Sequence, residues 1–281
     1  MFNILHQSLS VGIVTTSYPD QPPTVSDHAR GRPEFDFAKW QDARPAAEVC
    51  PTQAISCQDI YGERSVNFDL GKCVFCGLCA EADSAIRMTT ACELASVRRQ
   101  DLKWTARYRL AKNGAHQQLL EAPGTPGATN QSLADLGQHL REQIHRVLSR
   151  SLHIREVDAG SCNGCEIEIV GLNNPIYDAE RFGIHFVASP RHADMLLVTG
   201  PVTRNMELAL RKTYDATPEP RLVVAVGACG CSGGMFGVNY ATRGAVDAVV
   251  PVDVYIPGCP PNPHALLYGL LLALDRLPKK R

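Results

Sequence analysis

Four cysteines in the second half of the chain have the neighbours of a metal site. They stand in three short motifs, S-C-N-G-C-E at 161–166, G-A-C-G-C-S-G-G at 227–234 and P-G-C-P-P at 257–261. The four thiols belong to Cys162, Cys165, Cys229 and Cys259. Four thiolates are the ligand set of an iron–sulfur cluster, and glycines in all three motifs permit tight turns that direct backbone amides at cluster sulfurs. The motifs therefore predict a 4Fe–4S cluster rather than four buried cysteines that only fill space.

A second group of cysteines lies in the first third of the chain. The run C-V-F-C-G-L-C places Cys73, Cys76 and Cys79 at the C-x2-C-x2-C spacing of ferredoxins, and a Cys-Pro pair begins upstream at Cys50. In ferredoxins with two clusters the fourth cysteine of each run binds the other cluster, so Cys50 is expected to complete this site. Four cysteines also suit a structural zinc ion, but the spacing favours a 4Fe–4S cluster.

The ligands of a second ferredoxin cluster are missing. Counting the C-x2-C-x2-C-x3-C pattern back from Cys50 and forward from Cys79 gives four positions that hold other residues: Trp40, Ala43, Ala46 and Asp83. All four would have belonged to one cluster, whereas the other keeps its whole ligand set. The pattern therefore predicts one cluster in this part of the chain.

Three cysteines stand outside these two groups. Cys231 lies two residues after Cys229 in G-A-C-G-C, and spacing alone does not decide between their two thiols. Cys229 is the predicted ligand. Cys57 and Cys92 are expected to be small apolar residues of the core.

Length, charge and cysteine content limit the class of protein. The chain has 281 residues, a formal net charge of −1 and 11 cysteines. Two domains are expected for this length, and the balanced charge argues against nucleic acid as a partner. Residues 1–13 lack the basic region and apolar run of an export signal, and the apolar stretch 265–274 is too short to span a bilayer. The chain is therefore expected in a reducing, cytoplasmic compartment, where clustered cysteines bind metals.

The first half divides into three parts. Residues 1–38, rich in proline and polar side chains, are predicted to form an extended arm that wraps a partner or lies on its own domain. Residues 39–95 are predicted to form a small α+β ferredoxin-like domain with short strands at 66–70 and 85–88. Residues 96–130 combine a basic segment with a Pro/Gly linker. The basic segment is expected to be a solvated helix face, or else a docking surface for an acidic partner or lipid headgroups.

The second domain, residues 131–281, is predicted to be α/β with a doubly wound, mostly parallel, flavodoxin-like sheet. It begins with an amphipathic helix at 133–148. Short apolar strands then alternate with helices. The strands are expected at 154–157, 184–188, 195–199, 222–226 and 252–256, and the helices at 166–172, 206–214 and 264–274. Three strands lead directly into the cysteine motifs, and sites in such sheets form beyond the carboxyl ends of strands, so the three motifs are expected to meet there.

A series of motifs in 151–277 carries a resemblance to a known family. They are D-A-G-S-C-N-G-C-E-I-E, D-A-E-R-F-G-I, S-P-R-H-A-D, T-G-P-V-T-R, V-G-A-C-G-C-S-G-G and V-D-V-Y-I-P-G-C-P-P. This region resembles the small electron-transfer subunit of energy-converting NiFe hydrogenases, with the formate hydrogenlyase type nearest. The related subunit of complex I has a tandem Cys-Cys where this chain has C-N-G-C. This difference favours the hydrogenase subunit over the complex I subunit. The N-terminal part, with T-T-S-Y-P, R-G-R-P-E and F-D-L-G-K-C-V-F-C-G-L-C, is similar to the polyferredoxin-type subunit of the same complexes, fused here and reduced by one cluster.

The resemblance implies a function and a set of partners. The Cys162 cluster would face a NiFe-type large catalytic subunit, and the chain would relay single electrons between that subunit, the Cys50 cluster and a soluble donor or acceptor. The chain itself would carry no catalytic residue. It would also contact membrane-arm subunits of a complex I-like assembly, which would hold it on the inner face of the cell membrane. Glu166 and Arg204 are expected near the Cys162 cluster, where they would tune its potential or help to move protons; ordinary salt bridges are the alternative.

Two other functions remain open at this point. Hydrogenase-related complexes without nickel carry the same small-subunit pattern, so the chain could serve a quinone-reducing or nickel-free oxidoreductase. A structural zinc protein is the third reading, and it would contain zinc and no iron.

Overall fold

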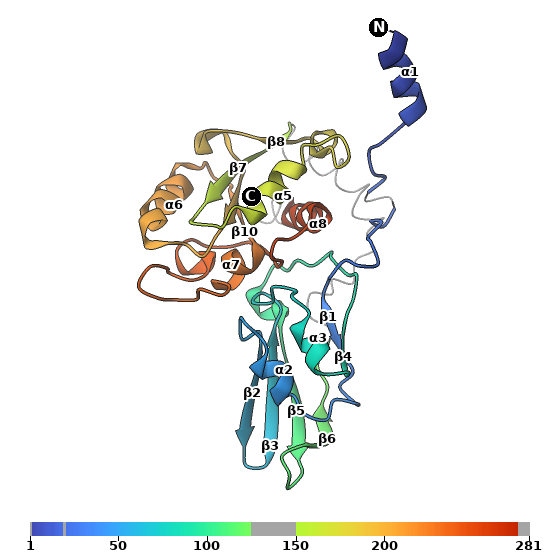
Figure 1. Ribbon diagram of the computed structural model, residues 1–281. Coiled ribbons are helices and arrows are strands. Elements are labelled where there is room, and N and C mark those ends of the chain that lie inside the picture. Colours follow the sequence, from blue (N-terminus) through green and yellow to red (C-terminus); the bar gives the residue numbers. More distant parts are fainter. Residues whose placement is uncertain (1, 19–20, 125–149, 275–281) are drawn as a thin grey trace.

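The molecule has two lobes, each built on its own sheet (Figure 1). The computed structural model describes residues 2–18, 21–124 and 150–274. One lobe holds a five-stranded parallel sheet and the other a four-stranded antiparallel sheet. Helix α1 (Phe2–Val11) projects from the body at the N-terminal end of the chain.

The parallel sheet has the strand order β11-β10-β9-β7-β8. Its strands are β7 (Leu152–Asp158), β8 (Ile184–Phe186), β9 (Met195–Thr199), β10 (Leu222–Val226) and β11 (Val254–Ile256). Numbered from β7 within this lobe, the order is 2-1-3-4-5, which is the doubly wound order of flavodoxin-like folds. The predicted fold class is confirmed.

Helices cover both faces of this sheet, and this is why its central strands are apolar throughout. α5 (Gly164–Gly171) and α8 (Pro263–Leu274) pack on the face that carries Leu197. α6 (Arg204–Ala216) and α7 (Gly227–Ser232) pack on the opposite face, which carries Leu196. Every residue of β9 and of β10 is buried, as expected for parallel strands covered on both sides.

Helix α8 is apolar apart from His264 and Tyr268, and it is buried against this sheet. It has 12 residues. Within the described ranges, no helix combines the length and apolar character needed to cross a bilayer. Short 3-10 helices complete this lobe: η2 (Ala179–Phe182), η3 (Pro190–His192) and η4 (Val246–Ala248).

The antiparallel sheet has the order β2-β3-β5-β6. Its strands are β2 (Ile55–Ile60), β3 (Glu63–Asp69), β5 (Lys103–Leu110) and β6 (His116–Glu121). Beside it lie the short helices α2 (Arg44–Glu48) and α3 (Leu78–Ala82), the strand pair β1 (Pro33–Phe35) and β4 (Ile86–Met88), and the 3-10 helix η1 (Arg99–Leu102).

Most of the basic segment is strand β5, so the expected helix face is wrong. Side chains along β5 alternate between core and solvent. Trp104, Ala106 and Tyr108 are buried, and Lys103, Thr105, Arg107 and Arg109 are exposed. This is the period of a strand with one buried face, whereas a helix would have buried side chains three or four positions apart. Arg107 pairs with Glu63 of β3 across the exposed face, N–O 2.6 Å.

Residues 1–38 were predicted to form an extended arm, but they are not extended throughout. They contain α1, and β1 pairs with β4. Between them, residues 15–18 lie on the parallel-sheet lobe, where the amide of Thr16 donates to the Ile176 carbonyl at 2.8 Å and Arg181 donates to the Tyr18 carbonyl at 2.8 Å. The amphipathic helix predicted at 133–148 and most of the predicted linker lie outside the described residues.

Candidate metal centres

The carboxyl ends of three parallel strands carry the second-half cysteines. β7 leads into the turn with Cys162 and Cys165, β10 leads into α7 with Cys229, and β11 leads into the loop with Cys259. The four thiols lie near enough to interact electrostatically. Burial raises the pKa of Cys165, and the charges of Glu166, Cys229, Cys259 and Cys162 raise it further. Burial, followed by the charges of Cys259 and Cys162, raises the pKa of Cys229 to about 11.

Two glycines allow the backbone to come this close to the sulfurs. Gly227 has φ +78°, and a Cβ there would lie 2.7 Å from Sγ of Cys165. Gly234 has φ +56°, and a Cβ there would lie 2.8 Å from Sγ of Cys229. Both distances are shorter than any ordinary carbon–sulfur contact, and both φ values disfavour L side chains. Each position therefore requires glycine for the loops to pack around the thiols.

This group of thiols opens at the surface. Cys162 and Cys259 are exposed, and Cys165 and Cys229 are partly buried. Exposed apolar side chains lie close by in the chain: Ile167 and Val170 on α5, and Met235 and Phe236 directly after Gly234. An apolar surface beside exposed thiols is typical of a site that a protein partner covers.

Cys231 lies apart from the group, although it is only two residues from Cys229. Its side chain is completely buried, and its thiol faces the carbonyl of Ala225 at 3.7 Å. Burial raises the pKa of Cys231 to about 12, and the neighbouring charges that act on it are Arg99, Asp69 and Asp247 rather than the other thiols of the site. Cys57 on β2 and Cys92 are partly buried and lie outside both groups.

Glu166 lies beside the exposed group of thiols, and Arg204 is the first residue of α6. The hydroxyl of Thr199, at the end of β9, donates to the Glu166 carboxylate. Arg204 is exposed at the start of α6, where its guanidinium donates to the Asn239 carbonyl at 3.2 Å. Glu166 therefore stands in electrostatic contact with the cysteines, whereas Arg204 contacts the loop that follows Cys229.

The first-half cysteines line one hollow in the antiparallel-sheet lobe. Cys50, Cys73, Cys76 and Cys79 all face a space of about 350 Å³, its open mouth included, together with apolar side chains such as Phe68. Burial raises the pKa of Cys73 to about 12; a backbone hydrogen bond from Phe75 opposes the rise, and the other three thiols add to it. With its pKa raised in this way, the Cys73 thiol needs a positive centre to hold it as a thiolate, and metal binding provides one.

Backbone amides already point at these sulfurs. The amide of Ala54 donates to Sγ of Cys50 at 3.2 Å, and the amide of Phe75 donates to Sγ of Cys73 at 3.4 Å. Phe75 has φ +55°, a conformation that non-glycine residues seldom adopt. Amide hydrogen bonds to cysteine sulfurs are among the features that set cluster potentials, so the loop geometry suits an iron–sulfur cluster.

Within the described part of the chain, no three side chains of Cys, His, Asp or Glu converge closely enough to hold one ion.

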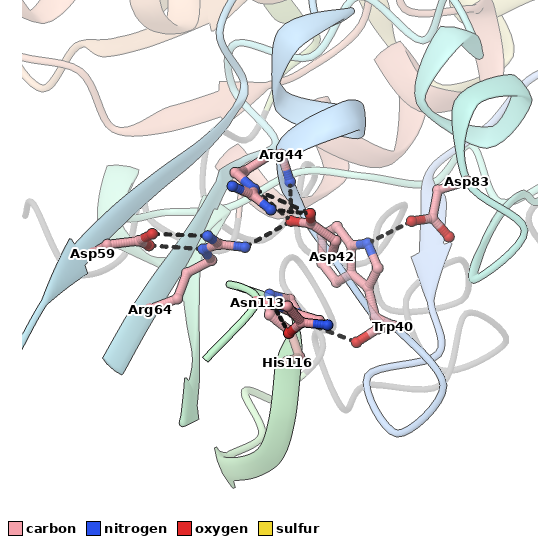
Figure 2. Close-up of polar contacts among 9 residues, drawn as sticks. Trp40, Asp42, Arg44, Asp59, Arg64, Asp83, Asn113 and His116 are labelled. Carbon is pink, nitrogen blue, oxygen red and sulfur yellow. Dashed lines mark hydrogen bonds and ion pairs between the residues drawn. The ribbon is translucent and has the colours of Figure 1, made fainter. Parts of the chain in front are cut away.

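The positions where the ferredoxin pattern would place the ligands of a second cluster hold packed side chains. Trp40, Ala43 and Ala46 have relative exposures of 2%, 0% and 0%. The indole nitrogen of Trp40 donates to the Asp83 carboxylate at 3.0 Å, so the first and last positions of the lost ligand set now bind each other (Figure 2). The Trp40 ring also packs on Phe35, with ring centroids 5.2 Å apart.

A buried ion-pair network lies beside Trp40. Arg64 is fully buried, and its guanidinium makes two hydrogen bonds to Asp59, both 2.7 Å, and one to Asp42 at 2.6 Å (Figure 2). The Nδ1–H of the His116 ring donates to the Trp40 carbonyl, 2.8 Å away. The region is a packed structural core without thiols at the four positions.

Replacement of Trp40 by alanine is expected to destabilise this lobe. Because the indole is buried in the core of this lobe, Trp40→Ala should lower the free energy of unfolding by about 3–5 kcal/mol in urea titrations followed by circular dichroism. Trp40→Phe keeps much of the ring volume and should cost clearly less. Equal stability of wild type and Trp40→Ala would show that the indole does not stabilise this core.

Comparisons with known proteins agree with the fold and the cysteine loops. Residues 162–273 match the family model described as NADH ubiquinone oxidoreductase, 20 Kd subunit. The protein named "Probable membrane-bound hydrogenase subunit mbhJ" of Pyrococcus furiosus is 49% identical over 137 residues, 49% of this chain and 82% of that protein. Formate hydrogenlyase subunit 7 of Escherichia coli is 48% identical over 155 residues, 55% of this chain and 59% of that protein.

One solved structure is also similar. A chain in the structure of the membrane-bound sulfane sulfur reductase, described as an archaeal respiratory membrane complex, is 36% identical, with a TM-score of 0.42 over 49% of this chain and 75% of that one.

The fold, the cysteine loops and the sequence relatives define the class as a subunit of an oxidoreductase complex related to complex I. The chain belongs to the family of the membrane-bound hydrogenase subunit mbhJ, and its residues 162–273 match the model of the NADH ubiquinone oxidoreductase 20 Kd subunit. The alignments with these relatives cover about half of this chain.

Proposed function

We propose that this chain is an electron-transfer subunit that holds two 4Fe–4S clusters in a membrane-bound NiFe hydrogenase of the formate hydrogenlyase type. Bound clusters of this kind accept and release single electrons. Cys50, Cys73, Cys76 and Cys79 hold one cluster, and Cys162, Cys165, Cys229 and Cys259 hold the other. The observation that carries the proposal is the gathering of two complete sets of four thiols, because cysteines placed for packing alone would not form two such groups.

The two cysteine loops face each other, which suits a relay between them. Phe75, between Cys73 and Cys76, lines the same hollow as Gly258 and Pro260, on either side of Cys259. This space amounts to about 340 Å³ with its open mouth included. The shared hollow supports the passage of electrons between the two sets of cysteines.

A separate large subunit of NiFe type covers the exposed thiols in this proposal. Cys162 and Cys259 are exposed, and Ile167, Val170, Met235 and Phe236 add apolar surface around them. The reaction takes place in that subunit, and this chain delivers or removes electrons. Membrane-arm subunits hold the assembly on the inner face of the cell membrane, in line with relatives named as membrane-bound, and a soluble redox subunit exchanges electrons with the Cys50 site.

A quinone-reducing or nickel-free complex I-like oxidoreductase is the second candidate, since the family model is that of a complex I subunit. Metal analysis of the complex, purified through a tag on this chain, separates the candidates. Iron together with nickel supports the hydrogenase, and iron without nickel supports the second candidate. Zinc without iron would overturn both.

Glu166 is assigned a tuning role at the Cys162 site. Its carboxylate is the first charge, after burial, that acts on Cys165. Removing a negative charge beside a cluster makes reduction easier, so Glu166→Gln should raise the midpoint potential in redox titrations followed by paramagnetic resonance, and should slow hydrogen turnover if the carboxylate also moves protons. Glu168→Gln, on the same helix beside Tyr177, is the control. An unchanged potential would remove the tuning role, and unchanged turnover the proton-transfer role.

A further inference from the structure

A short segment connects the two cysteine loops through its backbone. Ser96 forms an antiparallel bridge with Tyr255 of β11, with N–O distances of 3.0 and 2.8 Å. Tyr255 lies four residues before Cys259. At the other end of the segment, the carbonyl of Leu102 accepts from the amide of Leu70, 2.8 Å away and three residues before Cys73. The segment from Ser96 to Leu102 is thus bonded to the chain leading into each site.

The side chain of Arg99, in the middle of this segment, binds both loops directly. Its Nε donates to the carbonyl of Cys231 at 2.7 Å, and its Nη2 donates to the Asp69 carboxylate at 2.7 Å. Both members of the ion pair are only 14% exposed. The guanidinium lies flat over Gly71, where a Cβ would be 2.8 Å from Cζ.

Each of these partners is close in sequence to a cysteine of one site. The other oxygen of Asp69 accepts from the amide of Gly71 at 3.0 Å, which shapes the turn into Cys73. Cys231 lies in the same turn of α7 as Cys229. One guanidinium therefore joins the Cys73 turn to the Cys229 helix.

Arg99 keeps its positive charge although its side chain is largely buried. Burial lowers the pKa of Arg99, but the hydrogen bond and charge of Asp69 outweigh it, so the pKa is raised overall. The guanidinium is largely buried and binds one partner on each loop. Moving it away from either partner would leave a buried charge without that hydrogen bond, so this contact resists displacement more than a single neutral hydrogen bond would.

We infer that Arg99 is a positioning residue that fixes the spacing between the two cluster-binding loops and so sets the rate at which electrons pass between them. The inference rests on the two-cluster function proposed above. It assigns to Arg99 no part in binding iron and none in the chemistry of the large subunit. Electron transfer falls off steeply with distance, so a small movement of either loop changes the rate.

The test compares Arg99→Met with wild type in the assembled complex. Arg99→Met keeps the aliphatic stem but loses both bonds, so amide hydrogen exchange should speed up several-fold in residues 69–73 and 229–233. The magnetic coupling between the two reduced clusters should weaken, and electron passage between them should slow several-fold, while the iron content stays at the wild-type level. Asp69→Asn, which loses the charge of the pair but can keep a hydrogen bond, should show smaller changes of the same kind.

Arg98→Met is the matched control. Arg98 is 75% exposed and pairs with Asp101 within the same segment, so its removal should leave exchange, coupling and rate unchanged. Unchanged coupling and rate in Arg99→Met, with both clusters present, would overturn the inference, even if the protein were less stable. If Arg99→Met does not load its clusters, Asp69→Asn and Arg99→Lys decide by the same readouts. If the wild-type chain holds fewer than two clusters, that result overturns the proposed function instead.

Discussion

A Cys229→Ala chain is expected to lose the iron and the paramagnetic signal of one cluster and to keep those of the other. Cys229 lies with Cys162, Cys165 and Cys259 at the carboxyl edge of the parallel sheet, and Gly234 packs against its sulfur. A cluster with one of its four thiolates removed loses the anchor of one iron. Iron per chain should therefore fall by about half, and hydrogen turnover of the complex should be abolished, because the site next to the large subunit no longer passes electrons.

Cys231→Ala is the matched control, since it removes a thiol two residues away on the same short helix. Cys231 is buried and faces the Ala225 carbonyl rather than the other thiols. Its removal should leave iron content and turnover near the wild-type level and cost only a small amount of stability. The assignment of Cys229 would be wrong if Cys231→Ala lost the cluster and Cys229→Ala kept it.

A Cys50→Ala chain is expected to lose the other cluster. Cys50 lies in a different loop from Cys73, Cys76 and Cys79 but lines the same hollow, and the amide of Ala54 donates to its sulfur. About half of the iron should be lost, the signal of the Cys162 site should persist, and electron exchange with a soluble redox partner should fail. Turnover driven by direct reduction of the large subunit should survive, since the remaining cluster lies on that side.

Cys57→Ala provides the comparison for Cys50→Ala. Cys57 lies on β2, seven residues later, and is partly buried outside the hollow. Its replacement should not alter the iron content. Equal iron in wild type and Cys50→Ala would show that the fourth ligand of this site is another group.

The parallel-sheet lobe was predictable because its strands are apolar runs with clear ends. The strands at 195–199 and 222–226 occur at the predicted residues, since strands buried on both faces leave little choice of register. The strand expected at 252–256 begins two residues later, at Val254. The convergence of the three cysteine motifs followed from the same topology, because carboxyl ends of parallel strands share one edge.

Two other features were predicted wrongly or left undecided. The six basic residues between 97 and 112 suggested a charged helix face. The sequence K-W-T-A-R-Y-R-L nevertheless alternates polar and apolar residues, as a strand does. The two thiols of G-A-C-G-C could not be separated by spacing. In the structure they differ because residues two apart on a helix point in different directions.

Contacts between residues far apart in the chain are the features that the sequence could not predict. The bond from Arg99 to Cys231 joins residues 132 positions apart, and the bond from Trp40 to Asp83 joins residues 43 apart. Counting ferredoxin positions identified Trp40 and Asp83 as the ends of a lost ligand set, but gave no indication that they bind each other. Such contacts depend on how the lobes and loops pack, which no short motif records.

The most direct test of the central claim is iron analysis of the full chain, purified without oxygen, combined with a reductive titration followed by paramagnetic resonance. Two 4Fe–4S clusters predict about eight irons per chain and two signals that appear at separate potentials. A colourless preparation that contains zinc and no iron would contradict the account, and so would a chain with iron for a single cluster.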